Sequence, residues 1–90
     1  MINPEKSDGL NIDEFGTKRW YINGLRHITD GPAEEYADGS KFWYLNGQEH
    51  RTDGPAEEWA NVEKYWRLNG QQLTEVEFKI IQLQRIMDKF

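Results

Sequence analysis

The chain has 90 residues, a formal net charge of −5 and no cysteine, but four Trp, four Tyr and four Phe. This length suits one domain with a small, aromatic core, and the lack of cysteine excludes disulfides and thiolate metal sites. The acidic charge argues against general nucleic-acid binding, which needs a basic surface. No apolar run is as long as a membrane span, and residues 1–16 lack the features of a secretory signal. We therefore expect a cytoplasmic protein that does not enter a membrane.

The chain repeats itself at a spacing of 23 residues. Residues 30–52 match residues 53–75 at 13 of 23 positions, and residues 18–29 match residues 41–52 at 7 of 12. A fixed period of this kind indicates a repeat architecture. We predict one domain with an N-terminal segment and degenerate first strand (1–17), a repeat sheet (18–73) and a C-terminal capping helix (74–90).

Each repeat contains aromatic strands that end at an Asn-Gly pair. Asn-Gly predicts a two-residue type I′ hairpin turn, because both central residues need positive φ. The three pairs are Asn23-Gly24, Asn46-Gly47 and Asn69-Gly70. The strands on either side of each pair are therefore expected to be antiparallel neighbours.

A second turn is predicted at Asp38-Gly39, again with two residues. This register places Tyr36 opposite Lys41 and Glu34 opposite Trp43. In the following copy the same place is taken by Asn61-Val62. Because a β-branched residue tolerates positive φ poorly, we expect strain or another turn type there.

The predicted register gives the sheet two faces. One is expected to be the structural core, with the histidines: Trp20, Tyr36, Trp43, Trp59, Trp66, His27 and His50. The other is expected to be an exposed partner-binding face: Tyr21, Phe42, Tyr44, Tyr65, Arg19, Arg51 and Arg67. Tyr and Arg are enriched at interface hot spots. The alternative is that these aromatic and charged pairs only stabilise the sheet.

Residues 74–90 predict an amphipathic helix that begins with a capping box at Thr74 and Glu77. Its apolar stripe is expected to cover the Trp-rich face: Val76, Ile80, Leu83, Met87 and Phe90. Phe78, Ile81 and Ile86 widen the stripe or stay partly exposed, where they could support a homodimer. In the 23-residue register Leu73 takes the position of the histidines, so the repeat ends where the helix begins.

Candidate catalytic residues occur as repeated pairs. His27 with Asp30 recurs as His50 with Asp53, and a motif copied with its repeat favours packing over catalysis. We expect these histidines to hold the Asp-Gly-Pro turn. The adjacent glutamates 34–35 and 57–58 point to opposite faces of a strand and do not converge on one substrate atom. Zinc usually needs four ligands, and no phosphate-loop or nucleophile motif is present. The sequence predicts no enzyme activity, no metal and no cofactor.

The segments WYINGLRHITDGPA (20–33) and WYLNGQEHRTDGPA (43–56) carry a family resemblance. They resemble the MORN-like repeats of small phage and bacterial proteins, which are mostly of unknown function. The resemblance covers about residues 17 to 73. It implies a mainly β fold, a single-layer antiparallel β-meander, here capped by one C-terminal α-helix. It also implies an interaction or scaffold module.

We therefore expect a non-enzymatic protein-binding module, of the kind a phage uses to bind or inhibit a host factor in the host cytoplasm. One alternative is an acidic mimic of nucleic acid that blocks the basic cleft of a defence or DNA-processing enzyme. Another is a structural homo-oligomeric module, a homodimer that pairs through an edge strand or the C-terminal helix. An enzyme or carbohydrate binder would need a concave pocket, which a single-layer sheet seldom offers.

Overall fold

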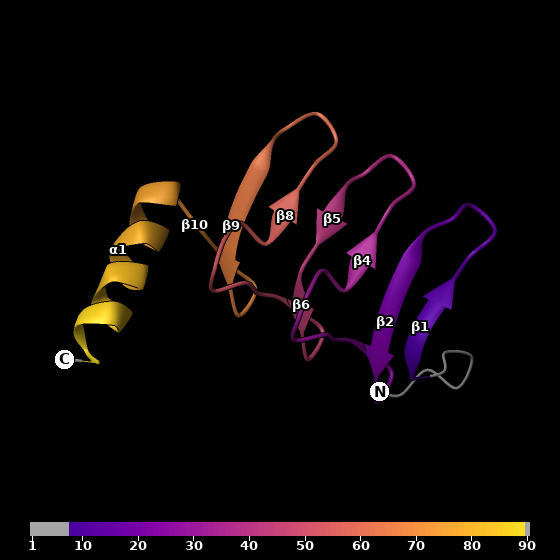
Figure 1. Cartoon of the computed structure of the whole chain (residues 1–90), viewed down its shortest axis with the longest axis horizontal. Helices are drawn as coiled ribbons and strands as arrows, with labels where there is room; N and C mark the ends of the chain where they lie inside the picture. Colours follow the sequence, from indigo (N-terminus) through magenta and orange to yellow (C-terminus); the bar gives the residue numbers. More distant parts are fainter. Residues whose placement is uncertain (1–7, 90) are drawn as a thin grey trace.

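The computed structural model describes residues 8–89 as a single-layer antiparallel sheet followed by one helix (Figure 1). The strands are β1 (Gly9–Ile12), β2 (Lys18–Ile22), β3 (Leu25–Arg26), β4 (Glu34–Glu35), β5 (Lys41–Phe42), β6 (Tyr44–Leu45), β7 (Gln48–Glu49), β8 (Glu57–Glu58), β9 (Lys64–Leu68) and β10 (Gln71–Leu73). The helix, α1, spans Glu75–Met87. The predicted mainly β meander with one C-terminal helix is confirmed.

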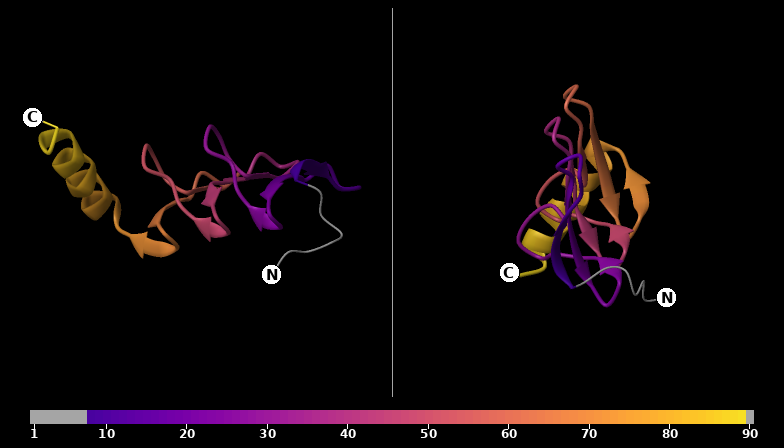
Figure 2. Two further views of the ribbon diagram at one scale, coloured as in Figure 1. Left: turned by 90° about the horizontal axis from the view of Figure 1, so that it is seen from below. Right: turned by 90° about the vertical axis from the view of Figure 1, so that its right-hand side faces the viewer.

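The strands follow one another across the sheet in the order β1-β2-β4-β5-β8-β9-β10, while β3 pairs with β2 and β6 pairs with β7 as a separate hairpin. Seen edge-on, the strands lie in one layer and the helix continues beyond the last of them (Figure 2). Residues 1–7 of the predicted N-terminal segment and Phe90 of the predicted helical stripe lie outside the described residues.

The three Asn-Gly turns have the predicted geometry. Their asparagines have φ values of 48° to 52° and their glycines 77° to 81°. The flanking residues pair directly across each turn: Ile22 with Leu25, Leu45 with Gln48, and Leu68 with Gln71. These are two-residue loops with positive φ at both positions, as a type I′ turn requires.

The second turn has three residues, so the predicted two-residue turn at Asp38-Gly39 is wrong. The backbone of Tyr36 donates to Ser40 O at 2.9 Å, and Glu34 pairs with Phe42. The loop contains Ala37, Asp38 and Gly39, the last at φ +95°. Equivalent loops at 14–16 and 60–62 also end in a residue with positive φ. Three-residue hairpin loops typically place their last residue in this left-handed conformation.

The one-residue difference in loop length places Tyr36 and Trp59 on the same face as Phe42 rather than on the opposite face, because side chains alternate between the faces of a strand. Within this face the exposures differ from the predicted ones. Tyr21 and Phe42, predicted to be exposed, are only 7% exposed. Tyr36 and Trp59, predicted to be core, are 36% and 43% exposed. The other predicted core residues are half-buried: Trp20, Trp43, Trp66, His27 and His50.

Three consecutive residues, which we call the clasp, join each repeat to the next. The clasp at residues 26–28 binds the turn at Asn46-Gly47 through one acceptor side chain flanked by two backbone bonds. These bonds are Gly47 N to Arg26 O (3.0 Å), Asn46 N to His27 Nδ1 (2.9 Å) and Ile28 N to Tyr44 O (3.3 Å). The clasp at residues 49–51 repeats them: Gly70 N to Glu49 O (2.8 Å), Asn69 N to His50 Nδ1 (2.9 Å) and Arg51 N to Arg67 O (3.2 Å).

The clasp explains why the histidines recur and where they stop. They bind the Asn-Gly turn of the next repeat, rather than the Asp-Gly-Pro turn that the sequence suggested. The first turn has no repeat before it, and there the carboxylate of Asp8 accepts from Asn23 N at 2.9 Å. After the last repeat no turn follows, and Leu73 replaces the histidine.

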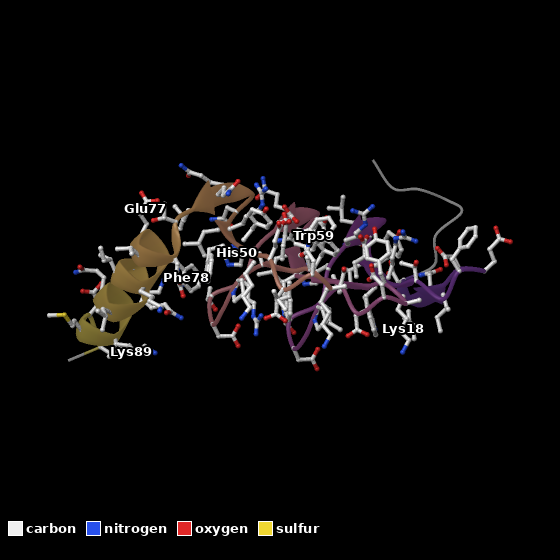
Figure 3. All side chains as sticks on the ribbon, turned by 90° about the horizontal axis from the view of Figure 1, so that it is seen from above. Lys18, His50, Trp59, Glu77, Phe78 and Lys89 are labelled. Atoms are coloured by element: carbon white, nitrogen blue, oxygen red, sulfur yellow. The ribbon has the colours of Figure 1, made fainter. Side chains whose placement is uncertain are left out.

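The helix begins as predicted but presents the opposite side to the sheet. Thr74 and Glu77 form the capping box. Phe78, 2% exposed, points toward the end of the sheet (Figure 3). The stripe predicted to cover the Trp-rich face is exposed instead: Val76 68%, Ile80 58%, Leu83 59% and Met87 68%. Only Thr74 separates β10 from α1, so the helix leaves from the sheet end and packs against β9 and β10.

Val62→Gly should stabilise the protein by about 1 kcal/mol. Val62 has φ +67° and is 84% exposed. Glycine therefore removes the cost of a left-handed β-branched residue and loses little packing. Urea unfolding measures the change. As the matched control, Gly39→Val should destabilise by a similar amount. A Cβ at Gly39 meets no atom within 4 Å, so the cost comes from the positive φ of this position and not from a clash. Equal stability of wild type and Val62→Gly would contradict the assigned strain.

Acidification should weaken the second clasp. His50 Nδ1 accepts a backbone hydrogen bond and must stay unprotonated, and burial, with Arg85 adding a smaller effect, lowers the pKa of His50. In an unfolded chain the pKa of histidine is about 6.5. The stabilisation is therefore complete above that pH and is lost as pH falls through the lower folded pKa. The free energy of unfolding should change less between pH 8 and pH 5.5 for His50→Leu than for wild type. An equal change in both proteins would refute the role of His50 as an acceptor.

Candidate functional site

One face of the sheet, here called the Glu34 face, gathers the titratable and aromatic side chains. The strand register places one row of residues side by side across five strands. The Glu34 face is the face that carries this row: Arg19, Glu34, Phe42, Glu57 and Tyr65. Within this row two glutamates are buried, Glu34 at 4% exposed and Glu57 at 8%. Burying a carboxylate is costly unless it is paired, so their partners determine the character of this face.

Glu34 is surrounded by two hydrogen-bond donors, Arg19 and Tyr36, and by Arg26, which forms an ion pair with it. Arg19 Nε lies 3.1 Å and Arg26 Nε 3.0 Å from its Oε2. The hydroxyl of Tyr36 donates to its Oε1 at 2.6 Å. Arg26 also lies over the ring of Tyr44, 5.2 Å from the ring centre. The glutamate is thus fully engaged within the sheet, which favours a structural role over a catalytic one.

Glu57 repeats this arrangement with different donors. Trp59 Nε1 donates to its Oε1 at 2.9 Å and Arg67 Nε donates to its Oε2 at 2.9 Å. Arg67 Nε also lies 2.8 Å from Glu49 Oε2. In the 23-residue register Glu49 takes the position of Arg26, and Arg67 takes that of Tyr44. The Arg26–Tyr44 cation–aromatic contact of one repeat is therefore replaced by the Glu49–Arg67 ion pair in the next.

A single Arg67 Nε facing two carboxylates favours a shared proton. Burial, followed by the adjacent Glu57 carboxylate, raises the pKa of Glu49 to about 7. Burial alone would also raise the pKa of Glu57, but hydrogen bonds from Glu49, Trp59 and Arg67 lower it below its ordinary value. When the pair holds one proton, that proton therefore resides on Glu49 rather than on Glu57.

An aromatic cluster occupies the centre of the Glu34 face. Phe42 is buried between Tyr36 and Trp59, with ring centres 5.6 and 5.1 Å away and nearly perpendicular planes. Such edge-to-face pairs are stabilising. Arg19 lies 5.8 Å from the Tyr36 ring centre. The result is a buried ring flanked by two partly exposed rings and a cation.

The structure divides the predicted partner-binding residues between two faces. Four of them contact the buried glutamates or lie in their row: Arg19, Phe42, Tyr65 and Arg67. A fifth, Tyr44, packs beside Arg26. Tyr21 is paired with Arg26 across the first Asn-Gly turn and is buried. Arg51 instead bonds Glu58, whose side chain points opposite to that of Glu57.

The opposite face carries an alternating row of charges: Lys18, Glu35, Lys41, Glu58 and Lys64. Nearby, a hollow of about 380 Å³ lies between two successive Thr-Asp-Gly loops, with Trp43, Arg51 and His50 in its lining. Arg51 stacks 3.8 Å above the Trp43 ring and also pairs with Asp53 and Glu58. The one arginine that lines the hollow is therefore already engaged.

The buried glutamates were not identified from the sequence as site residues. The signal was present, because Ala-Glu-Glu-aromatic occurs twice at the repeat spacing. The alanine of this motif, Ala33 or Ala56, is fully buried. Its carbonyl accepts a hydrogen bond from the backbone N–H of Trp20 or Trp43, respectively.

Within residues 8–89, no group of three or more His, Cys, Asp or Glu side chains could hold a metal ion. Across the same part of the chain, no helix is long and apolar enough to span a membrane. Comparison with known proteins gives no match among family models, curated proteins or solved structures.

Glu49→Gln should flatten the pH dependence of stability between about pH 4.5 and 7. Because the folded pKa of Glu49 is raised from 4.5 to about 7, its contribution is complete below pH 4.5 and is lost as pH rises through 7. A neutral amide avoids that loss, so the variant should be relatively more stable at pH 8 than at pH 5. Urea unfolding at both pH values measures this. Glu35→Gln, on the other face, serves as control, and equal pH sensitivity of Glu49→Gln and wild type would contradict the shared proton.

Proposed function

We propose that the chain is a non-enzymatic protein-binding module and that its contact surface is the Glu34 face around Phe42. The observation that carries the proposal is the aromatic cluster. Trp59 and Tyr36 remain 43% and 36% exposed beside a buried Phe42, with Arg19 next to them. Trp, Tyr and Arg dominate interface hot spots, which centre on a well-packed anchor.

The arrangement of carboxylates favours this proposal over an acidic mimic of nucleic acid. A mimic needs unpaired carboxylates along one surface. Here the buried glutamates 34 and 57 are each paired with arginine, and on the other face lysines alternate with Glu35 and Glu58. The negative field is thus partly neutralised on both faces of the sheet.

We also propose that the chain is a MORN-like repeat protein. Its role would be that of a phage-type accessory protein that binds or inhibits a host factor. They rest on the sequence resemblance at residues 20–33 and 43–56. The repeat clasp, which builds an open sheet without closing it, is compatible with a scaffold of this kind.

The test is capture of partners from a bacterial lysate, with mass spectrometry and then measured affinities. Trp59→Ala/Tyr65→Ala should weaken binding about 30-fold, the size of a hot-spot loss of about 2 kcal/mol. Lys41→Ala/Lys64→Ala, on the opposite face, should bind as wild type does. Thermal melts confirm that both variants fold. A partner that ignores the aromatic change and is released by salt would instead support the acidic mimic.

A further inference from the structure

The three Asn-Gly turns carry a pair of residues that can deamidate. Asparagine is chemically labile, and a following glycine has no Cβ to hinder the reaction. The glycine nitrogen attacks the asparagine side-chain carbon Cγ and gives up its proton to a solvent base, while the side-chain nitrogen takes up a proton and leaves as ammonia. Water then opens the resulting succinimide ring at one of its two ring C–N bonds to give aspartate or isoaspartate. All three asparagines are exposed: Asn23, Asn46 and Asn69.

The clasp engages the attacking nitrogen in the second and third turns. Gly47 N donates to Arg26 O at 3.0 Å, and Gly70 N donates to Glu49 O at 2.8 Å. To reach Cγ, this nitrogen must rotate toward the asparagine side chain, and the rotation breaks its hydrogen bond to the clasp. Ring closure in these two turns therefore carries the additional cost of one backbone hydrogen bond.

The first Asn-Gly turn lacks this restraint on its glycine. Its asparagine N–H is bound by Asp8 at 2.9 Å, as His27 and His50 bind those of the later turns. Within residues 8–89, however, Gly24 N meets no hydrogen-bond acceptor. Backbone conformation does not distinguish the turns, because the three asparagine φ values are 52°, 50° and 48°. The turns differ in the hydrogen bond to the attacking nitrogen.

We propose that Asn23 is the site at which this protein deamidates, and that the clasp protects the asparagines of the two later turns. Either product adds a negative charge beside the carboxylate of Asp8. Isoaspartate also adds one atom to the backbone of the loop, and loop length fixes the register of a hairpin. The pairing of Ile22 with Leu25 across this turn therefore changes. This inference does not rest on the proposed protein-binding function.

The first test compares the three turns within one folded protein. Trypsin cleaves after Lys and Arg and leaves each turn in its own peptide: 20–26, 42–51 and 68–79. After incubation at pH 8, mass spectrometry should show deamidation at Asn23 about fivefold faster than at the other two asparagines, which corresponds to about 1 kcal/mol, the size of one hydrogen bond. Equal rates in the three peptides, or a faster reaction in either later turn, would overturn the proposal.

Incubation in guanidinium chloride is the control for local sequence. All three turns share the Asn-Gly pair, so the unfolded chain should deamidate at similar rates in each of them. A preference for Asn23 that persists in the unfolded chain would come from its neighbours in the sequence rather than from the clasp, and would overturn the assigned cause.

The second test removes one clasp acceptor at a time. His27→Leu should raise the deamidation rate at Asn46 severalfold and leave Asn69 unchanged, and His50→Leu should do the reverse, so each variant is the matched control for the other. Leucine is the residue that the third repeat carries at this position, as Leu73. Unchanged rates at both asparagines would overturn protection by the clasp. An equal rise in all three turns would overturn it too, because the reaction would then follow loss of the whole fold.

Discussion

The hydrogen bond from each Asn-Gly turn to a side-chain acceptor in the preceding segment is the contact on which the rest of the repeat depends. A two-stranded hairpin is marginally stable alone in water. Here the first turn is bound by Asp8, and the two later turns are bound by the clasp of the preceding repeat through His27 or His50. Each repeat is thereby stabilised by contacts with its nearest neighbours, as in other repeat proteins. The array can end only where no further turn needs an acceptor, and at that position Leu73 precedes the helix cap Thr74.

The sheet compensates for a very small apolar core with paired charges. Its largest buried apolar side chains are three aromatic rings among residues 8–89, Tyr21, Phe42 and Phe78. On either side of Phe42 lie Glu34 and Glu57, each bonded to arginine and to an aromatic donor. Buried ion pairs of this kind contribute little net stability but are costly to break. They therefore fix which strands are neighbours more than they raise the free energy of unfolding.

Local turn chemistry was readable from the sequence, whereas loop length was not. Asn-Gly requires one geometry, and those turns were predicted correctly. Asp38-Gly39 is compatible with a two-residue or a three-residue loop, and only the recurrence of Gly16, Gly39 and Val62 at the last loop position separates the two. That single residue decides whether Tyr36 and Trp59 lie on the same face as Phe42 or on the opposite one. The apolar stripe of α1, from Val76 to Met87, was likewise periodic. The short link at Thr74, rather than periodicity, determines which side of α1 meets the strands.

The side-chain hydrogen bond to each Asn-Gly turn is directional, since its acceptor, Asp8, His27 or His50, lies in the earlier segment and its donor in the later one. An in-frame duplication of one 23-residue unit would consequently supply its own acceptor and its own turn, and would leave Asp8 and Leu73 at the two ends unchanged. Repeat number can thus change in evolution by whole units without any compensating substitution. The length of the molecule is open to selection, while the chemistry of its ends is not.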